Sequence, residues 1–168
     1  NLFSSTILTN CTFSGNSAGY GGGVDNLFSS TILTNCTFSG NSASNQGGGI
    51  YNASEGGQSP LTLTNCIIWN NNQANNNNGI AGASIYNESG PTSININASL
   101  PQISYSLIQS SGGSGNWNNA IGNDGGHNID MDPLFVLPVN PSDAPTTAGD
   151  LHLQPNSPAI NVGNNYAV

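Results

Sequence analysis

The sequence predicts an all-β protein: a right-handed parallel β-helix with coils of about 25 residues and three short strands in each coil. Residues 1–18 recur letter for letter at 26–43, which gives a period of 25 residues. Apolar clusters recur within each period, and Gly, Asn and Ser, which favour turns, separate them. A propeller blade needs about 40–50 residues, so this period favours a solenoid.

The strands are predicted from three apolar clusters in each repeat, whose members are spaced by two residues, as in a β-strand. One is the Val or Ile after a run of glycines, the second is a leucine stretch before an asparagine, and the third is a cysteine with the residue two positions later. Their members are Val24, Ile50 and Ile85; Leu8, Leu33, Leu61 and Leu63; and Cys11, Phe13, Cys36, Phe38, Cys66 and Ile68.

The chain is expected to form a single domain over residues 1–168 with five to six coils. Regular repeats occupy 1–72, irregular coils with long loops occupy 73–128, and C-terminal coils occupy 129–168. The polar runs at 70–78 and 112–126 are typical of surface loops. Ile94 and Ile96 are predicted to continue the strand pattern. The last strands are predicted around Ile129 and at 134–136, 151–153 and 160–162.

Asparagine occupies one corner of every regular coil, at Asn10, Asn35 and Asn65. Asn enters the left-handed backbone region more easily than most residues. Stacked Asn side chains can also hydrogen-bond to one another along the solenoid. We therefore expect these three residues to form a structural ladder.

Three cysteines, Cys11, Cys36 and Cys66, share one inward phase. Buried thiols behave as small hydrophobic groups, so a stacked column is expected. Neighbouring coils lie about 4.8 Å apart, which also permits one disulfide and leaves one thiol over. The sequence leaves the redox state open, and a metal bound by the three thiols lacks a fourth ligand in the column.

The composition excludes several classes of function. Asn, Ser, Gly and Thr make up 84 of 168 residues, the eight charged residues are all acidic, and Lys and Arg are absent. Without cations the chain cannot neutralise phosphates, which argues against nucleic acid and anionic membranes. Membrane insertion through a helix is not expected, because no apolar run approaches about 18 residues.

Asp124, His127, Asp130 and Asp132 form the best candidate for chemistry. Carboxylates beside a histidine can act as acid and base, and Asp130 with Asp132 is a candidate site for a structural Ca²⁺. The competing interpretation is that Asp130 and Asp132 shape the turn before Pro133. The chain is not expected to need any cofactor other than this calcium, and an enzymatic activity is the less favoured interpretation.

Three further sets of residues are candidate surface features. Five aromatic residues near turns are candidates for stacking on sugar rings: Tyr20, Tyr51, Trp69, Tyr86 and Trp117. Three sequons are candidates for N-glycosylation: Asn52, Asn87 and Asn97. An outward threonine column, a short version of the flat arrays that bind ice, comprises Thr9, Thr34 and Thr64.

Two motifs carry a family resemblance. The FSGN segments at 13–16 and 38–41 and the GGGV and GGGI segments at 21–24 and 47–50 resemble the paired FxxN and GGA[ILV] repeats of polymorphic outer membrane proteins. The segments at 105–108, 128–135, 150–154 and 157–163 are similar to bacterial β-helix proteins of the choice-of-anchor Q type. The resemblance implies a right-handed β-helix in a secreted or surface-attached protein.

These observations together favour an extracellular, secreted or cell-surface protein with a structural or adhesive role. Both ends of the solenoid are expected to expose unpaired strand edges, so the favoured partner is the protein itself, stacked end to end into a filament. A carbohydrate or a host cell surface is the other expected partner. The alternative function is that of a polysaccharide-active or carbohydrate-binding β-helix protein, which the absence of Lys and Arg makes less favoured for charged uronate substrates.

Overall fold

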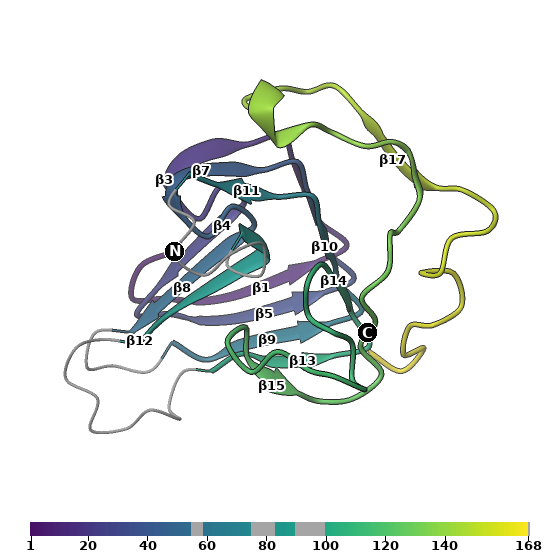
Figure 1. The fold of residues 1–168 in the computed structure, drawn as a ribbon. Coiled ribbons are helices and arrows are strands. Elements are labelled where there is room, and N and C mark those ends of the chain that lie inside the picture. The colour runs from purple at the N-terminus through teal and green to yellow at the C-terminus, as the bar shows by residue number, and fades with distance from the viewer. Residues whose placement is uncertain (55–58, 75–82, 90–99, 168) are drawn as a thin grey trace.

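The computed structural model describes residues 1–54, 59–74, 83–89 and 100–167 and confirms the right-handed parallel β-helix (Figure 1). The first coil contains β1 (Ser5–Thr9), β2 (Thr12–Ser14), β3 (Ser17–Tyr20) and β4 (Val24–Leu27). The second repeats them as β5 (Ser30–Thr34), β6 (Thr37–Ser39), β7 (Ser42–Gln46) and β8 (Ile50–Ser54). The apolar clusters correspond to β1, β2 and β4, and β3, with the sequence SAGY, completes the coil.

The later coils keep this order with fewer strands. The third coil contains β9 (Leu61–Thr64), β10 (Ile67–Trp69), β11 (Asn72–Gln73) and β12 (Ile85–Ser89). Then follow β13 (Gln102–Ser104), β14 (Leu107–Ile108) and β15 (Asn123–Asp124). Strand β11 lies inside the run at 70–78 that we expected to be a loop, because its backbone pairs with Ser42 and Ala43 of β7. Ile94 and Ile96 lie outside the described residues.

Equivalent strands of successive coils pair in parallel (Figure 1). The largest sheet has the order β1-β5-β9-β13-β15, and three further sheets have the orders β2-β6-β10-β14, β3-β7-β11 and β4-β8-β12. In the first two coils each residue therefore faces its own duplicate, as Ile7 faces Ile32 and Phe13 faces Phe38. The exact repeat in the sequence thus fixes the register of the first two coils.

A residue with positive φ marks each of the four corners of a regular coil. Glycine supplies two corners, at Gly15 and Gly40 and at Gly21 and Gly47, because it has no Cβ to clash in this region. The predicted Asn corner also has positive φ, near 55° at Asn10, Asn35 and Asn65. The fourth corner carries phenylalanine, at Phe3 and Phe28, which the sequence does not indicate.

The core is a set of side-chain columns inside the coils. Leu33 and Leu63 are fully buried in one column, and Phe38 and Ile68 in another. The Phe13 and Phe38 rings stack with centroids 4.6 Å apart and planes 9° apart. Burying one such side chain contributes about 1.5–3 kcal/mol, so the columns supply the main drive for coiling.

Two buried asparagine ladders, which the sequence does not indicate, run through this core. At the start of β3 and its equivalents, the backbone N–H and Nδ2 of Asn16 donate to Oδ1 of Asn41 (3.0 and 2.9 Å), and Asn41 donates in the same way to Asn71. Inside the sheet of β4, Nδ2 of Asn26 donates to Oδ1 of Asn52 at 2.7 Å. In both ladders, each hydrogen bond from one asparagine to the next is donated toward the C-terminal coil.

The C-terminal segment differs from our expectation of coils over 129–168. Ile129 makes one last parallel bridge to Leu107, and then β16 (Phe135–Leu137) pairs antiparallel with β17 (Asp150–Leu153) around a 3-10 helix, η1 (Pro141–Asp143). Residues 160–162 lie in a turn rather than a strand. Prolines interrupt this segment, and each removes an N–H that a parallel ladder would need.

We call residues 133–167 the strap, because they run back along the side of the solenoid (Figure 1). The N–H of Thr146 donates to the carbonyl of Gly15 (2.8 Å) in the first coil, and Nδ2 of Asn70 in the third coil donates to the carbonyl of Val139 (2.8 Å). The strap fits only over small corner residues, since a Cβ on Gly40 would lie 2.4 Å from Cβ of Val139. It therefore ties the first three coils together lengthwise.

The central asparagine ladder generates a stability prediction. The substitution Asn41→Ala removes four hydrogen bonds of a fully buried amide and leaves its partners unsatisfied. We expect the free energy of unfolding to fall by about 2–4 kcal/mol, measured by urea denaturation. Ser44→Ala, at an exposed position on β7, is the control and should change it by less than about 0.5 kcal/mol. Equal effects of the two substitutions would contradict a structural role for the ladder.

Candidate functional site

Asp124 serves a local turn at the end of β15. Its Oδ1 accepts hydrogen bonds from the Ser114 hydroxyl (2.9 Å), the Gly126 N–H (2.9 Å) and Nδ2 of Asn128 (2.7 Å). Burial works to raise the pKa of Asp124, but the hydrogen bonds from Gly126, Ser114 and Asn128 together hold it below its usual value. The carboxylate is thus ionised and already bonded within the fold.

Asp130 and Asp132 serve other turns. The two oxygens of Asp130 accept the backbone N–H groups of Ser110 (3.0 Å) and Gly112 (2.9 Å), and Oδ1 of Asp132 accepts the N–H of Leu134 (2.8 Å). The hydrogen bond from the N–H of Leu134 to Asp132 spans Pro133. Asp132 thus shapes a turn at this proline, which is the competing interpretation given above. Both carboxylates therefore have backbone donors.

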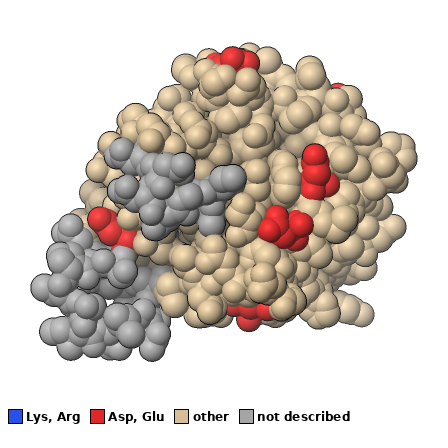
Figure 2. All heavy atoms as spheres, viewed as in Figure 1, with Lys and Arg blue, Asp and Glu red and all other residues tan. Residues whose placement is uncertain are grey.

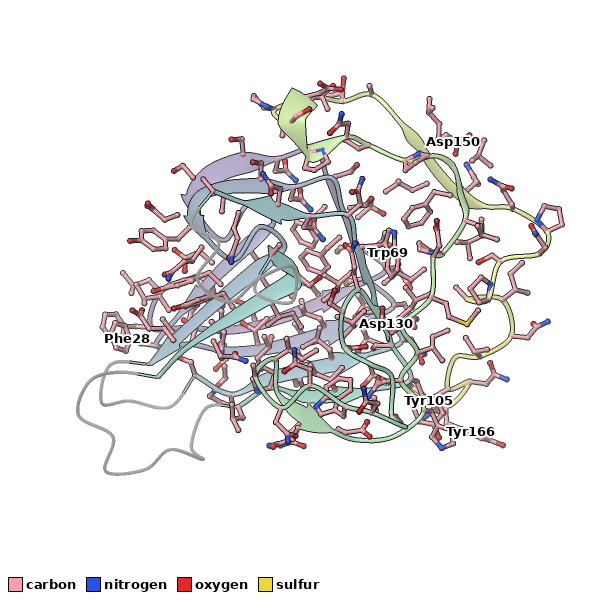
Figure 3. The ribbon with its side chains drawn as sticks, in the orientation of Figure 1. Phe28, Trp69, Tyr105, Asp130, Asp150 and Tyr166 are labelled. Atoms are coloured by element: carbon pink, nitrogen blue, oxygen red, sulfur yellow. The ribbon has the colours of Figure 1, made fainter. Side chains whose placement is uncertain are left out.

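His127 does not join these carboxylates in a shared cleft. Its ring stacks on Tyr105, with centroids 4.4 Å apart and planes 14° apart. In the described part of the chain, no group of three or more His, Cys, Asp or Glu side chains is arranged to hold a metal ion. The geometry gives each of the four candidate residues a separate local contact. Figure 3 shows Asp130 beside the last coil and Asp150 far from it on the strap.

The corner asparagines have contacts of two kinds. Nδ2 of Asn65 donates to Oδ1 of Asn35 at 3.0 Å, which is one rung of the expected ladder, whereas Asn10 contacts the second coil through its backbone N–H, which donates to the carbonyl of Thr34 (3.0 Å). Asn65 also binds the strap, because its Nδ2 donates to the carbonyl of Asn164 and its Oδ1 accepts the N–H of Asn164 (2.9 and 2.7 Å). The corner ladder thus extends into the contact with the strap.

The three cysteines are free thiols. Cys36 and Cys66 are each 1% exposed, whereas Cys11 is partly exposed in the first coil. Sγ of Cys36 donates to the carbonyl of Leu8 (3.4 Å), and Sγ of Cys66 donates to the carbonyl of Leu33 (3.6 Å), one coil back. The contact with the Cys36 thiol and burial both raise the pKa of Cys66 well above its usual value. Such a thiol is a poor nucleophile.

Two of the three candidate glycosylation sites are part of an interior ladder. Asn52 is 1% exposed and accepts from Asn26, so its amide is inaccessible in the folded protein, which argues against it as an acceptor. Nδ2 of Asn87 donates to the carbonyl of Ala120 (3.0 Å), so this amide is also engaged. Asn97 lies outside the described residues.

The aromatic residues do not form one sugar-binding surface. Tyr51 is buried between Tyr20 (centroids 4.9 Å) and Tyr86 (5.8 Å), and its hydroxyl donates to Glu88. Burial, followed by the bond to Glu88, raises the pKa of Tyr51 far above its usual value. Trp117 packs on the core, while Tyr20 remains 45% exposed. The candidate aromatics thus mainly pack within the fold, as Trp69 does on the partly buried strand β10.

The side wall of the first two coils carries an exposed apolar surface. We call Leu2, Phe3, Ile7, Phe28 and Ile32 the wall patch. Phe3 and Ile7 are 75% and 71% exposed, and Phe3 stacks on Phe28 with centroids 5.1 Å apart. Figure 3 shows Phe28 projecting at the edge of the molecule.

The rest of the largest sheet's outer face is small and polar, including the in-register column Thr9, Thr34 and Thr64. With no Lys or Arg in the chain, the surface in Figure 2 shows only scattered acidic residues. The wall patch is therefore an apolar surface on a wall that carries little charge.

The two ends of the solenoid differ. At the N-terminal face, β1, β2, β3 and β4 are the terminal strands of their sheets. At the C-terminal face, Trp117 and the buried Ile121 cover the core, and the carboxylate of Asp130 takes up two backbone N–H groups. We expected two open faces, and these contacts cover part of the C-terminal one among the described residues, where β11 and β12 still end their sheets. End-to-end stacking stays a prediction.

The two regular coils also carry a known repeat. Residues 10–26 and residues 35–53 each match the Chlamydia polymorphic membrane protein repeat. This match confirms the resemblance that the FSGN and GGGV segments indicate, and it covers β2–β4 and β6–β8. Proteins with this repeat are surface-associated bacterial proteins.

No curated protein and no solved structure matches the chain. Among the residues that the structure describes, no helix is long and apolar enough to cross a membrane.

The burial of the thiols predicts their reactivity. With iodoacetamide added to the native protein, we expect Cys11 to be alkylated first, and Cys36 and Cys66 to react only when the chain unfolds. Peptide mass spectrometry over a time course, with and without urea, measures this order. Equal native rates at all three positions would mean that the core opens easily.

The hydrogen bonds to Asp124 predict a pH-dependent stability. Its pKa in the folded protein lies below the ordinary value of 3.8, so its contribution is present above that value and is lost as the pH falls through the lower, folded-state pKa. Asp124→Asn should therefore lower the urea midpoint at about pH 7 and change it little at about pH 2. Asp143→Asn, on η1, is the matched control. A loss of equal size at both pH values would contradict a role for the charge.

Proposed function

We propose that this protein is an adhesive β-solenoid, displayed at a bacterial surface, which binds its target through the wall patch. The repeat of the first two coils is that of surface-associated bacterial proteins. The single observation that carries the adhesive role is the wall patch itself, because large apolar groups are exposed there, on the paired strands β1 and β5 at Ile7 and Ile32 and at the corner of the first coil at Phe3.

The fold of the solenoid does not depend on the outward apolar side chains of the wall patch. Inward residues of β1 and β5, such as Leu8 and Leu33, fill the core, whereas Ile7 and Ile32 point outward and are 71% and 44% exposed. Exposed apolar groups that gather on one surface mark interaction sites. The backbone of Ile7 and Ile32 is held by the pairing of β1 with β5, so these two residues lose little conformational entropy on binding.

The same wall favours a contact that does not depend on charge. The chain has no cation to pair with acidic groups of a target, and its acidic residues are few and scattered. Adhesion through the patch should therefore depend weakly on salt, unlike binding that is steered by charges.

The polysaccharide-active alternative has less support from the geometry. Asp124, Asp130 and Asp132 each accept backbone N–H groups at separate turns, so they are not free to share a substrate. A carbohydrate-binding role would rest on Tyr20, the most exposed of the stacked tyrosines.

An adhesion assay with a paired substitution tests the proposal. Fluorescent beads coated with the protein would be added to cultured epithelial cells, and bound beads counted by flow cytometry. We expect Ile32→Lys to reduce bead binding about tenfold, because a charge in the centre of an apolar contact must be desolvated.

The matched control is Val136→Lys, which places the same charge at a residue that is 53% exposed on the strap, away from the patch. It should leave binding within about twofold of the unmodified protein. Urea midpoints of both variants check that the fold is kept. If Ile32→Lys and the unmodified protein bind equally, the wall patch is not the adhesive surface.

A further inference from the structure

Two of the three core thiols occupy equivalent positions in neighbouring coils. Cys36 lies in the second coil and Cys66 in the third, and the residues that follow them, Thr37 and Ile67, are paired in register. The N–H of Ile67 donates to the carbonyl of Cys36 (2.9 Å), which holds the two backbones side by side. Equivalent Cα atoms of neighbouring coils lie about 4.8 Å apart, within the range of about 4.4–6.8 Å that a disulfide requires.

The two sulfur atoms are already in contact inside the core. Sγ of Cys66 lies 3.6 Å from the carbonyl oxygen of Leu33, so this side chain points back toward the second coil, which holds Cys36. The thiols of Cys36 and Cys66 are hydrogen-bonded to one another. Each residue is only 1% exposed. Packing alone therefore brings the pair together, and no backbone movement is needed to join them.

The thiol column ends at the third coil. Ser106 takes the place of cysteine in the fourth coil, because Leu107, which follows it, pairs with Ile67. Oγ of Ser106 accepts the backbone N–H of Cys66 at 3.0 Å. The chain has three cysteines, so the single thiol neighbour of Cys66 is Cys36. Any disulfide that includes Cys66 in the folded coil must therefore be formed with Cys36.

The hydrogen bond between the thiols makes them differ in acidity. The bond from Cys66 is the largest influence on the pKa of Cys36, which is lowered to about 6 against the opposing effect of burial, whereas the thiol of Cys11 has the smallest influence. The proton of the pair is thus held at Cys66, and Cys36 carries the thiolate. A thiolate is the form of cysteine that attacks a disulfide. Cys36 is the nucleophile of the column, and its main partner is Cys66.

We propose that Cys36 and Cys66 form a disulfide that locks the third coil to the second when the chain folds in an oxidising medium. The oxidant is a small disulfide such as oxidised glutathione. The Cys36 thiolate attacks one sulfur of the small disulfide, which gives a mixed disulfide and releases one small thiolate. Sγ of Cys66 then attacks the Cys36 sulfur, gives its proton to the released thiolate and expels the second small thiolate. Two protein thiols are oxidised, and one small disulfide is reduced to two thiols.

The closed core would then protect the bond. With both residues almost fully buried, a dissolved thiol reaches the bridge only after the coils open. A bridge between residues 36 and 66 also restricts the unfolded chain, which is the main way in which disulfides stabilise proteins. The bridge acts inside the solenoid, so it is independent of adhesion through the wall patch. Its only external requirement is the oxidising medium found outside cells.

Oxidative refolding of the whole chain tests the proposal. The reduced 168-residue protein would be unfolded in urea, refolded with oxidised and reduced glutathione, and alkylated with iodoacetamide in urea. Pepsin digestion at about pH 2 suits a chain without Lys or Arg and stops thiolate exchange before mass spectrometry. We expect one bridge, between Cys36 and Cys66, with Cys11 alkylated. The urea midpoint of the bridged protein should exceed that of the reduced protein by about 1 M or more.

Two substitutions within the column serve as matched variants. Cys11→Ser should keep both the bridge and the gain in urea midpoint, whereas Cys66→Ser should lose both. The mapping of the unmodified chain decides the proposal even if Cys66→Ser does not fold. The proposal is overturned if all three cysteines are alkylated after oxidative refolding, or if the bridge contains Cys11. It is also overturned if the bridged and reduced proteins have the same urea midpoint.

Discussion

Stacking of like on like is the constraint on which the rest of this structure depends. In a parallel solenoid each residue lies about 4.8 Å from its equivalent in the next coil. Each side chain must therefore be able to pack against a side chain of the same kind. Like charges at that distance repel. Phenylalanine rings, leucines and asparagine amides satisfy the same constraint attractively, as Phe13 on Phe38 and Asn41 on Asn71 show. The regular coils satisfy this rule, because no Lys or Arg occurs at their stacked positions.

The coil could be predicted from the sequence because the duplication fixes the period and the apolar spacing fixes the strands. The corner at Asn10 was also predictable, since Asn is one of the few residues that adopt positive φ easily. The corner at Phe28 was not, because its backbone is held by the coil and not by its own preference. The rings of Phe3 and Phe28 then stack outside, in the wall patch.

The buried ladders and the strap could not be predicted for different reasons. Asn26 and Asn52 read as polar surface residues, and only the closed coil shows that they are inside, where each amide satisfies the next. The pattern around β16 and β17 has the two-residue alternation of any strand, which does not distinguish a parallel coil from an antiparallel pair. Asp124, Asp130 and Asp132 do not converge on one site, because each carboxylate accepts hydrogen bonds from backbone N–H groups of a different turn.

The wall patch places apolar side chains on the outside of a nearly uncharged solenoid. A solenoid can carry them because its core requires only the inward half of each strand. The outward half is free to vary, and in the first two coils it carries isoleucine and phenylalanine.

The strap gives the solenoid a property that stacked repeats ordinarily lack. Repeats that touch only their neighbours can fray one at a time from an end. Here Asn65 bonds to Asn164, 99 residues along the chain, and Thr146 bonds to Gly15 in the first coil. Coils that form early in synthesis are thus fastened only when the strap has been made. The strap joins coils that do not touch each other, so loosening it would weaken the first and the third coil together.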